Sequence, residues 1–293
     1  MFQFIGLLLV IVLVLGALVS VGTGIMSALP FELMLICGAA LGTLLLGNSQ
    51  ATARSALAGL GTAFRGEKWS KQDYNDLLSL CYGLSRDARR GGLVSIEKDI
   101  EAPYASKRFT RYTRLVKDTS LVSTISDGFR FLGLDLSDPS RAEDALRQAI
   151  DAEREQRHRA ASALYTVADA LPALGIVAAV IGIIRAMAVI DQSPDIIGAM
   201  MASALLGTFL GVFLAYGVVG PIANRFSQSI DDDLLINEVA ASFISAHGRG
   251  LPARASAEIA RAVLPAHLQP DLDSLSHSFQ AERFGRDNSS RAA

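Results

Sequence analysis

The hydrophobic residues of this chain are concentrated in four nearly unbroken runs. The runs cover residues 2–21, about 33–47, about 171–190 and about 196–219. A bilayer core about 30 Å thick needs roughly 20 apolar helical residues to cross it, so the pattern predicts four transmembrane helices. Only short loops, residues 22–32 and 191–195, separate the two members of each pair, and we expect two helical hairpins.

Basic residues lie on one side of this predicted topology. None of the 27 Lys and Arg is in either hairpin loop, and those that flank the spans are Arg54, Arg65, Arg154, Arg157, Arg159 and Arg225. The loops carry only Glu32, Asp191 and Asp195. Because Lys and Arg collect on the cytoplasmic side of membrane helices, both termini and the long middle segment should face the cytoplasm. A cleaved signal peptide would carry Lys or Arg before its apolar region. None precedes the first run here, so we expect a retained anchor.

The predicted fold is an all-α membrane protein with four segments. These are a first transmembrane hairpin (1–47), a helical cytoplasmic domain (48–169), a second transmembrane hairpin (170–222), and a cytoplasmic C-terminal helix with a flexible tail (223–293). Apolar residues at helical spacing predict helices over residues 51–66 and 73–90. A helix start at Asp138-Pro139-Ser140 should continue into the third span. The polar sequence after about Pro265 predicts a loose tail.

Composition narrows the class of protein. Hydrophobic residues make up 51% of the 293 residues and charged residues 19%, which is typical of a membrane protein and excludes a disordered chain. A net charge of -2 excludes a general nucleic-acid-binding surface. Cys37 lies in an apolar run and Cys81 in a charged segment, so no disulfide between them is expected.

No enzyme motif in the sequence is complete. Residues 61–68 have the glycine spacing of a phosphate-binding loop, but Glu67 replaces the lysine and no strand precedes them. The four histidines, His158, His247, His267 and His277, lack the spacing of metal ligands. We therefore expect no catalysis, no cofactor and no metal site.

Small residues recur every four positions along the spans. The strips are Ala199, Ser203, Gly207, Gly211 and Ala215 in the fourth run, Ala178, Gly182 and Ala186 in the third, and Gly38 and Gly42 in the second. Such strips let helix backbones approach closely. They predict either packing within this chain or a surface on which a ring or a partner helix assembles, and the sequence leaves both open.

Few polar side chains lie inside the predicted spans. They are Thr43, Ser203, Thr208 and Tyr216, with Arg185 toward the outer end of the third run. Asp169 lies at the inner boundary and Glu32 falls in a loop, so no acidic residue is expected at membrane depth. If ions cross through the protein, the titrating carboxylate should belong to a partner chain.

Two prolines stand at the ends of the second hairpin. Pro172 falls in the first turn of the third span and Pro221 at the end of the fourth, either as helix punctuation or as a pair of hinges.

The predicted cytoplasmic domain contains a basic stretch. Between Arg86 and Arg130 lie ten Lys and Arg. They suit a solvated face beneath anionic lipid or a docking surface for a protein of complementary charge.

Three stretches resemble the MotA/PomA family of flagellar motor stator subunits. They are residues 167–180, residues 206–221, and the charged segment from Arg89 to Glu97 with the acidic residues that follow. The resemblance covers the whole predicted topology. The related ExbB/TolQ energisers of outer-membrane processes share the last two spans but have three, which makes them the alternative. A membrane scaffold whose strips merely pack is a third hypothesis.

The resemblance implies a ring of subunits, five in the family, around two copies of a MotB-like partner that grips peptidoglycan, in the bacterial inner membrane. Ions would protonate and release an aspartate on the partner, the ring would turn, and the cytoplasmic insert would push on the rotor protein FliG. By position, Ala179, Thr208, Tyr216 and Asp169 line the ion path, Pro172 and Pro221 are the hinges, and Arg89, Arg90 and Glu97 contact the rotor.

Ala179 bears on the identity of the ion. Sodium-driven relatives carry a Thr seven residues after the first proline, whereas Ala at this position resembles the proton-driven members. A hydroxyl helps to replace the water shell of sodium, and a proton needs only a wet path to a carboxylate. The resemblance therefore implies coupling to H+.

Overall fold

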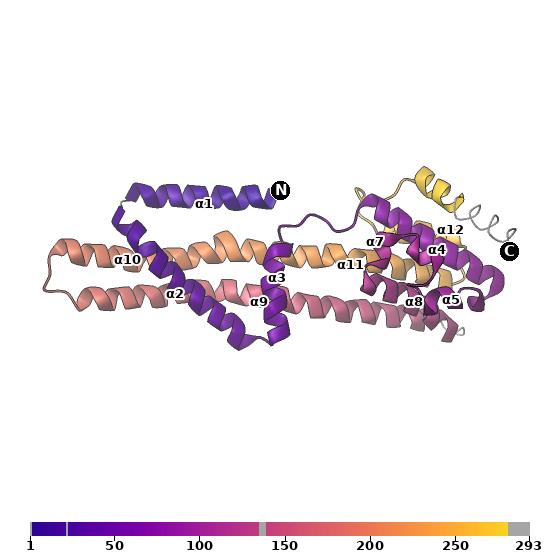
Figure 1. Cartoon of the computed structure of the whole chain (residues 1–293), viewed down its shortest axis with the longest axis horizontal. Coiled ribbons are helices and arrows are strands. Elements are labelled where there is room, and N and C mark those ends of the chain that lie inside the picture. The colour runs from indigo at the N-terminus through magenta and orange to yellow at the C-terminus, as the bar shows by residue number, and fades with distance from the viewer. Residues whose placement is uncertain (1, 22, 135–138, 281–293) are drawn as a thin grey trace. The chain divides into compact units, whose positions relative to one another are not determined.

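The computed structural model describes residues 2–21, 23–134 and 139–280, and all regular structure in these ranges is helical (Figure 1). The chain divides into two compact units. Residues 1–66 and 156–230 form the membrane unit, and residues 67–155 and 231–293 form the insert unit. These units divide the chain at other positions than the four expected segments, because two long helices each contribute residues to both.

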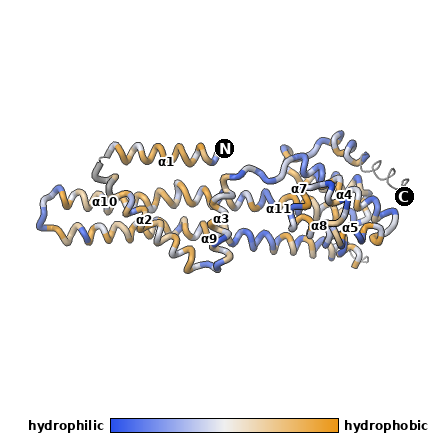
Figure 2. Tube along the Cα trace, in the orientation of Figure 1, coloured by the Kyte–Doolittle hydropathy of each residue, from blue (hydrophilic) through white to orange (hydrophobic). Residues whose placement is uncertain are grey.

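The membrane unit contains the predicted spans. Its elements are α1 (Phe2–Val21), α2 (Thr23–Gly47), α3 (Gln50–Thr62), the later part of α9 (Pro139–Met187), α10 (Pro194–Phe213), the π-helical turn η2 (Leu214–Val219) and the first turns of α11 (Gly220–Gly248). Among the described residues, four helices are long and apolar enough to cross a membrane. Figure 2 shows apolar residues running along α1, α2 and α10. The prediction of four spans in an all-helical fold is confirmed.

The first hairpin differs from the prediction at its turn. Helix α2 begins at Thr23, so Pro30 and Glu32 lie inside the second helix. A proline leaves one helical carbonyl without its usual donor, and membrane helices tolerate this where neighbouring elements cover the backbone. The loop predicted over residues 22–32 is therefore wrong from Thr23 onward, and Glu32 belongs to the span.

Helix α9 runs for 49 residues without a break. It begins at Pro139, where the sequence signal predicted a helix start, and it continues into the third span. Pro172 stands at the start of the apolar run, as expected, but inside this helix and not in the first turn of a helix. The apolar run located the span, but the polar residues before it are helical as well.

The fourth span continues past Pro221 instead of stopping there. After α10 the chain forms η2, and Pro221 is the second residue of α11. The amide of Gly220 donates to the carbonyl of Ala215, which is the wider spacing of a π-helix. Pro221 has no N–H with which to continue the α-helical ladder, and the wider turn before it absorbs the change of register.

Helices α9 and α10 pack closely because small residues face each other. A methyl group placed on Gly211 would lie 2.7 Å from the carbonyl oxygen of Leu171, and one placed on Gly175 would lie 2.8 Å from that of Gly207. No side chain larger than a hydrogen atom fits at these glycines. We call this interface the α9–α10 seam, and it consists of Leu171, Gly175, Ala178, Gly182, Ala204, Gly207 and Gly211.

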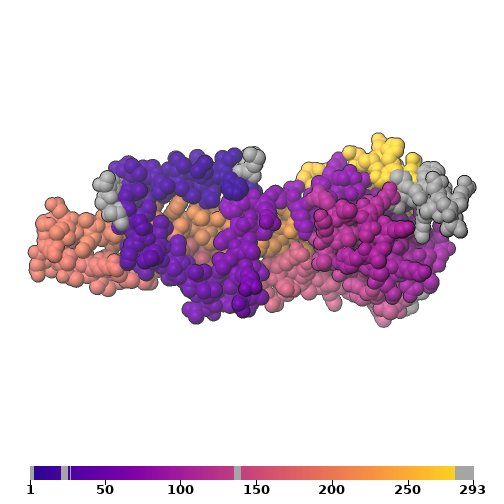
Figure 3. All heavy atoms as spheres, viewed as in Figure 1, coloured from indigo at the N-terminus to yellow at the C-terminus, as the bar shows by residue number. Residues whose placement is uncertain are grey.

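Helix α2 lies across the seam. Apolar residues of α2, α9 and α10 form one buried cluster, which includes Ile36, Ala40, Leu171, Ala178, Leu206 and Leu210. In Figure 1, α2 crosses α9 and α10 obliquely, and on the face shown in Figure 3, α1 and α2 cover part of the hairpin. The space beside Gly38 and Gly42 is open. The small residues of the α9–α10 seam therefore pack within this chain, whereas Ala199 of α10 is exposed and Gly38 and Gly42 of α2 face open space.

The insert unit is built from short and long helices. Its elements are α4 (Lys71–Gly91), η1 (Leu93–Ser95), α5 (Glu97–Glu101), α6 (Lys107–Thr110), α7 (Thr113–Val116), α8 (Thr119–Leu134), α12 (Ala253–Ala262) and the remaining parts of α9 and α11. Ser70 and Asp73 form a capping box that starts α4. Leucines at helical spacing, Leu77, Leu80 and Leu84, then bury one face of α4 completely.

The expected loose tail is wrong as far as residue 280. Residues 272–280 are helical, and they bury Leu275 and Phe279, which stand four positions apart on one helix face. The ring of Phe279 stacks on Tyr82 of α4 with centroids 4.1 Å apart. Two apolar anchors are enough to hold this otherwise polar segment. Residues 281–293 lie outside the described residues.

Replacing Gly211 with Ala should disturb the α9–α10 seam, because the added methyl group has no room beside the Leu171 carbonyl oxygen. Overpacking of this kind costs about 1–3 kcal/mol of stability. We expect Gly211→Ala to lower the thermal midpoint of the purified protein in detergent. The control Gly42→Ala, in open space on α2, should leave it unchanged. Equal midpoints for the two variants would show that the seam is not close-packed.

Candidate functional site

Two of the residues expected to line the ion path lie at the α9–α10 seam. The backbone nitrogen of Ala179 is 3.5 Å from the methyl position of Gly207, and the Cα of Thr208 is 3.3 Å from that of Gly175. Ala179 is only 8% exposed, because α10 approaches α9 so closely. The structure therefore brings Ala179 and Thr208 to one helix interface.

The other expected path and hinge residues are more open. Tyr216 lies in η2 with 70% of its surface exposed, and Asp169 is exposed on α9. Pro221 is exposed just after η2, and Pro172 is half-buried. Within the described residues no hydrogen bond or ion pair joins Asp169 or Tyr216 to the seam, and the roles of all these residues stay predictions.

Glu32 is the candidate that sequence reasoning missed. Only 3% of its surface is exposed. The hydroxyl of Ser203 on α10 donates to Oε1 of Glu32 at 3.3 Å, whereas Oε2 has no hydrogen-bond partner among the described residues. The expectation that no acidic residue lies within the spans is wrong. Pro30 made the stretch over residues 22–32, which includes Glu32, look like a loop. The signal was length: a span of about 20 residues that ends at Gly47 has to begin near Ala28.

The expected rotor-contact residues lie together at one end of α4. Arg89 and Arg90 occupy its last turn, and Glu97 is the first residue of α5. Gly92, with a φ of +72°, adopts a backbone conformation that favours glycine and turns the chain between the two helices. All three charged side chains are exposed, so this end of α4 presents both signs of charge to solvent.

Arg89 is tied to the turn that follows α11. Its guanidinium donates to the carbonyl of Gly250. In the last turn of α11 itself, Nδ1 of His247 lies 2.8 Å from the hydroxyl of Ser85. Burial, and secondly the charge of Arg89, lower the pKa of His247 to about 4. A neutral, hydrogen-bonded His247 therefore supports the end of α4 at neutral pH.

Part of the basic stretch is structural. Arg108 is largely covered, with its side chain 11% exposed, between Asp87, with which it forms an ion pair, and Asp99, whose Oδ2 lies 3.5 Å from Nη1 of the arginine. Arg86 also pairs with Asp87, at 3.3 Å. These two arginines belong neither to a solvated face nor to a docking surface, which corrects both expectations for them. Their charges hold α4 against the segment that contains α5 and α6.

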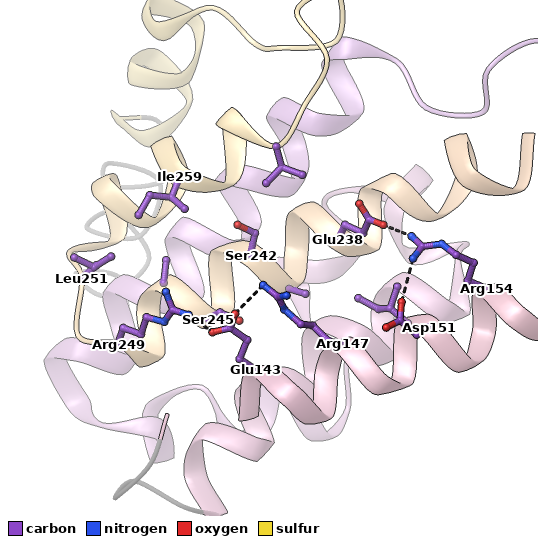
Figure 4. A pocket seen from close by; sticks show the side chains of 14 residues that line it. Glu143, Arg147, Asp151, Arg154, Glu238, Ser242, Ser245, Arg249, Leu251 and Ile259 are labelled. Atoms are coloured by element: carbon purple, nitrogen blue, oxygen red, sulfur yellow. Dashed lines mark hydrogen bonds and ion pairs between the residues drawn. The ribbon is translucent and has the colours of Figure 1, made fainter. Parts of the chain in front are cut away.

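A groove of about 510 Å³ lies on the insert unit between α9, α11 and α12 (Figure 4). Ion pairs along α9 form part of its wall, including Arg147 with Glu143 at 2.9 Å and Arg154 with Asp151 at 3.0 Å. No isolated sequence motif predicted this groove, because residues more than eighty positions apart line it. Its positive and negative groups are largely paired with each other.

Comparison with known proteins defines the class. The family "Motility protein A N-terminal" matches residues 4–92, and the "MotA/TolQ/ExbB proton channel family" matches residues 107–238. Together the two matches cover both hairpins and most of the insert. The four spans and the helical insert are therefore those of a protein in the proton channel family.

Individual relatives define the branch. Motility protein A of Salmonella typhimurium is 36% identical over 225 residues, which are 76% of this chain and 76% of the relative. Chemotaxis protein LafT of Vibrio parahaemolyticus is 30% identical over 285 residues, 97% of this chain and 99% of LafT. The fold is similar to that in the flagellar MotAB stator complex from Bacillus subtilis, with a TM-score of 0.69 at 18% identity, covering 92% of this chain and 98% of that one. The chain belongs to the MotA family of motility proteins.

The buried His247 predicts a pH dependence of stability. Above pH 6.5 the ring is neutral in both the folded and the unfolded chain, whereas between pH 6.5 and about 4 only the unfolded chain takes up the proton. The thermal midpoint should therefore fall as the pH decreases through this window, and His247→Gln should flatten part of that fall. The control His267→Gln, at an exposed histidine, should keep the wild-type slope. A wild-type slope in His247→Gln would contradict the burial of a neutral ring.

Proposed function

We propose that the chain is the proton-driven stator subunit of a bacterial flagellar motor. Five copies form a ring around a MotB-like, peptidoglycan-anchored partner in the inner membrane, with both termini in the cytoplasm. Proton flow between ring and partner turns the ring, and the end of α4 with Arg89, Arg90 and Glu97 pushes on the rotor protein FliG. The chain needs no cofactor and catalyses no reaction.

Family membership along nearly the whole chain carries this proposal. LafT matches 97% of the chain, and the relatives are named as motility and chemotaxis proteins. The solved structure from Bacillus subtilis is that of a MotAB stator complex, in which a MotA chain is assembled with MotB. These names support a motor function and a partner subunit for the present chain.

The geometry of the second hairpin supports an ion path beside a partner. Ala179 and Thr208 meet at the close-packed seam, and no hydroxyl stands at position 179 to replace the water shell of a sodium ion. The spans also expose large apolar side chains, among them Ile176, Ile183, Ile184 and Leu205. In a membrane protein such surface is available to lipid, to further copies of the chain or to a partner helix.

An ExbB/TolQ-type energiser is the second candidate, because the proton channel family that matches residues 107–238 includes those proteins. The first hairpin favours the motor. It carries two of the four candidate spans and is matched by the Motility protein A family. The two candidates differ in their partner: a single-span chain with a peptidoglycan-binding domain suits the motor, and one with a TonB-like domain suits the energiser.

Cells that lack their own stator proteins should swim when this chain is supplied with its MotB-like partner. We expect a protonophore to abolish swimming, and replacement of external sodium by potassium to leave its speed unchanged, because no hydroxyl is present at Ala179. Thr208→Leu, which places a bulky apolar group at the seam, should insert in the membrane but not restore swimming. Speed that follows external sodium and ignores the protonophore would refute proton coupling.

Reversing the charge of Arg89 should weaken torque, because the exposed end of α4 would present the wrong sign to the rotor. Arg89→Glu should reduce the swimming speed under load, and a compensating charge reversal on FliG should restore part of it. Arg254→Glu, an exposed reversal on α12, is the matched control and should swim normally. Normal torque from Arg89→Glu would remove the residue from the rotor contact.

A further inference from the structure

Glu32 is an acidic group held inside a membrane span, where the proposed function has no use for it. It is the only charged residue of α2, and 3% of its surface is exposed. An ionised carboxylate in such surroundings is costly, because it has lost most of its hydration. A group of this cost marks an ion-binding or proton-binding position by default.

Few charged groups act on Glu32. Arg185 of α9 attracts its charge, and the Arg185 guanidinium lies 4.5 Å from the centre of the Phe31 ring, next to Glu32 in the chain. The other charged residues of the packed spans are Asp195 in the first turn of α10 and Asp169 far along α9. Helix α1 has none. Among the described residues of these spans, Arg185 is therefore the basic residue beside Phe31 and Glu32.

The two oxygens of Glu32 have different surroundings. Oε1 accepts the hydrogen bond from Ser203, and Oε2 lies 3.0 Å from the methyl position of Gly207 without a partner among the described residues. A protonated carboxyl carries one O–H, and a buried lone pair without a donor is costly. Oε2 is the atom at which a proton relieves that cost, and it lies at the seam beside Ala178 and Ala179.

We propose that Glu32 is a second proton-binding site of the motor, contributed by this chain in addition to the carboxylate of the partner. A hydronium ion from water at the Arg185 side gives its proton to Oε2, which forms an O–H bond and leaves water behind. The bond breaks again when the proton passes to water or to the partner's carboxylate. The use of this site in rotation rests on the proposed function, but the binding of the proton does not.

Chemical labelling tests the site without any motor activity. Dicyclohexylcarbodiimide is an apolar reagent that adds to protonated carboxyl groups within membranes and increases the mass by one reagent molecule. With the full complex in membranes, we expect mass spectrometry to find the adduct on Glu32, and its yield to fall as the pH rises. Ser203→Ala, which removes the donor to the ionised carboxylate, should extend labelling to higher pH.

Rotation tests the use of the site. Glu32→Gln keeps the size and can still accept from Ser203, but it cannot take up or release a proton. We expect the variant to assemble with the partner and to rotate at least tenfold more slowly than the wild type. Glu32→Asp should rotate with a shifted dependence on external pH. Thr43→Val, which removes a hydroxyl bonded within α2, is the matched control and should rotate normally.

The outcomes separate the site from the motor. No adduct on Glu32 between pH 5 and 9, or an adduct whose yield ignores pH, would overturn the proton-binding site. If Glu32→Gln rotates at wild-type speed with the wild-type pH dependence, the carboxyl group only packs and the proposal is wrong. If Glu32→Gln fails to assemble, the labelling decides. A wild-type complex that neither rotates nor conducts protons would instead refute the proposed function.

Discussion

The membrane unit depends on the approach of two backbones, those of α9 and α10. At Gly175, Gly207 and Gly211 nothing but hydrogen atoms separates the helices, so dispersion contacts and not side-chain interdigitation hold them together. The same approach buries Ala179 and leaves a shallow surface on which α2 lies. Glu32 reaches Gly207 only because that residue has no side chain. Packing and candidate chemistry in this unit therefore share one cause.

The insert unit holds its helices together with ion pairs, not with a close approach of backbones. Arg108 between Asp87 and Asp99 is a largely covered ion cluster, in which the loss of hydration offsets much of the attraction between the charges. Charges that are paired inside the unit do not contribute to recognition at its surface. The exposed charges at the end of α4, to which we assign the proposed rotor contact, stand on a helix end that His247 and the Gly250 carbonyl hold in place.

The sequence was sufficient wherever one element determines its own state. Long apolar runs predicted the spans, helical spacing predicted α4, and a helix-start signal predicted α9. The sequence was insufficient wherever contacts with a distant segment determine the burial or the backbone conformation of a residue. Arg90 and Arg108 are both basic residues of one charged stretch of the sequence. Only the fold shows that Arg108 is paired with Asp87 and largely covered, whereas Arg90 is exposed. Pro30 and Pro221 indicate breaks by themselves, yet the helices continue, one of them by way of a π-helical turn. Resemblance placed Ala179 and Thr208 together, and neither resemblance nor pattern found Glu32.

The helix over residues 272–280 sets an order of events during synthesis. It covers α4 through the stacking of Phe279 on Tyr82 and a hydrogen bond from Asn75 to Ser278, between residues 203 positions apart. Both membrane hairpins are made before this helix leaves the ribosome. One side of α4 therefore stays uncovered until the ribosome has completed both hairpins and this last helix.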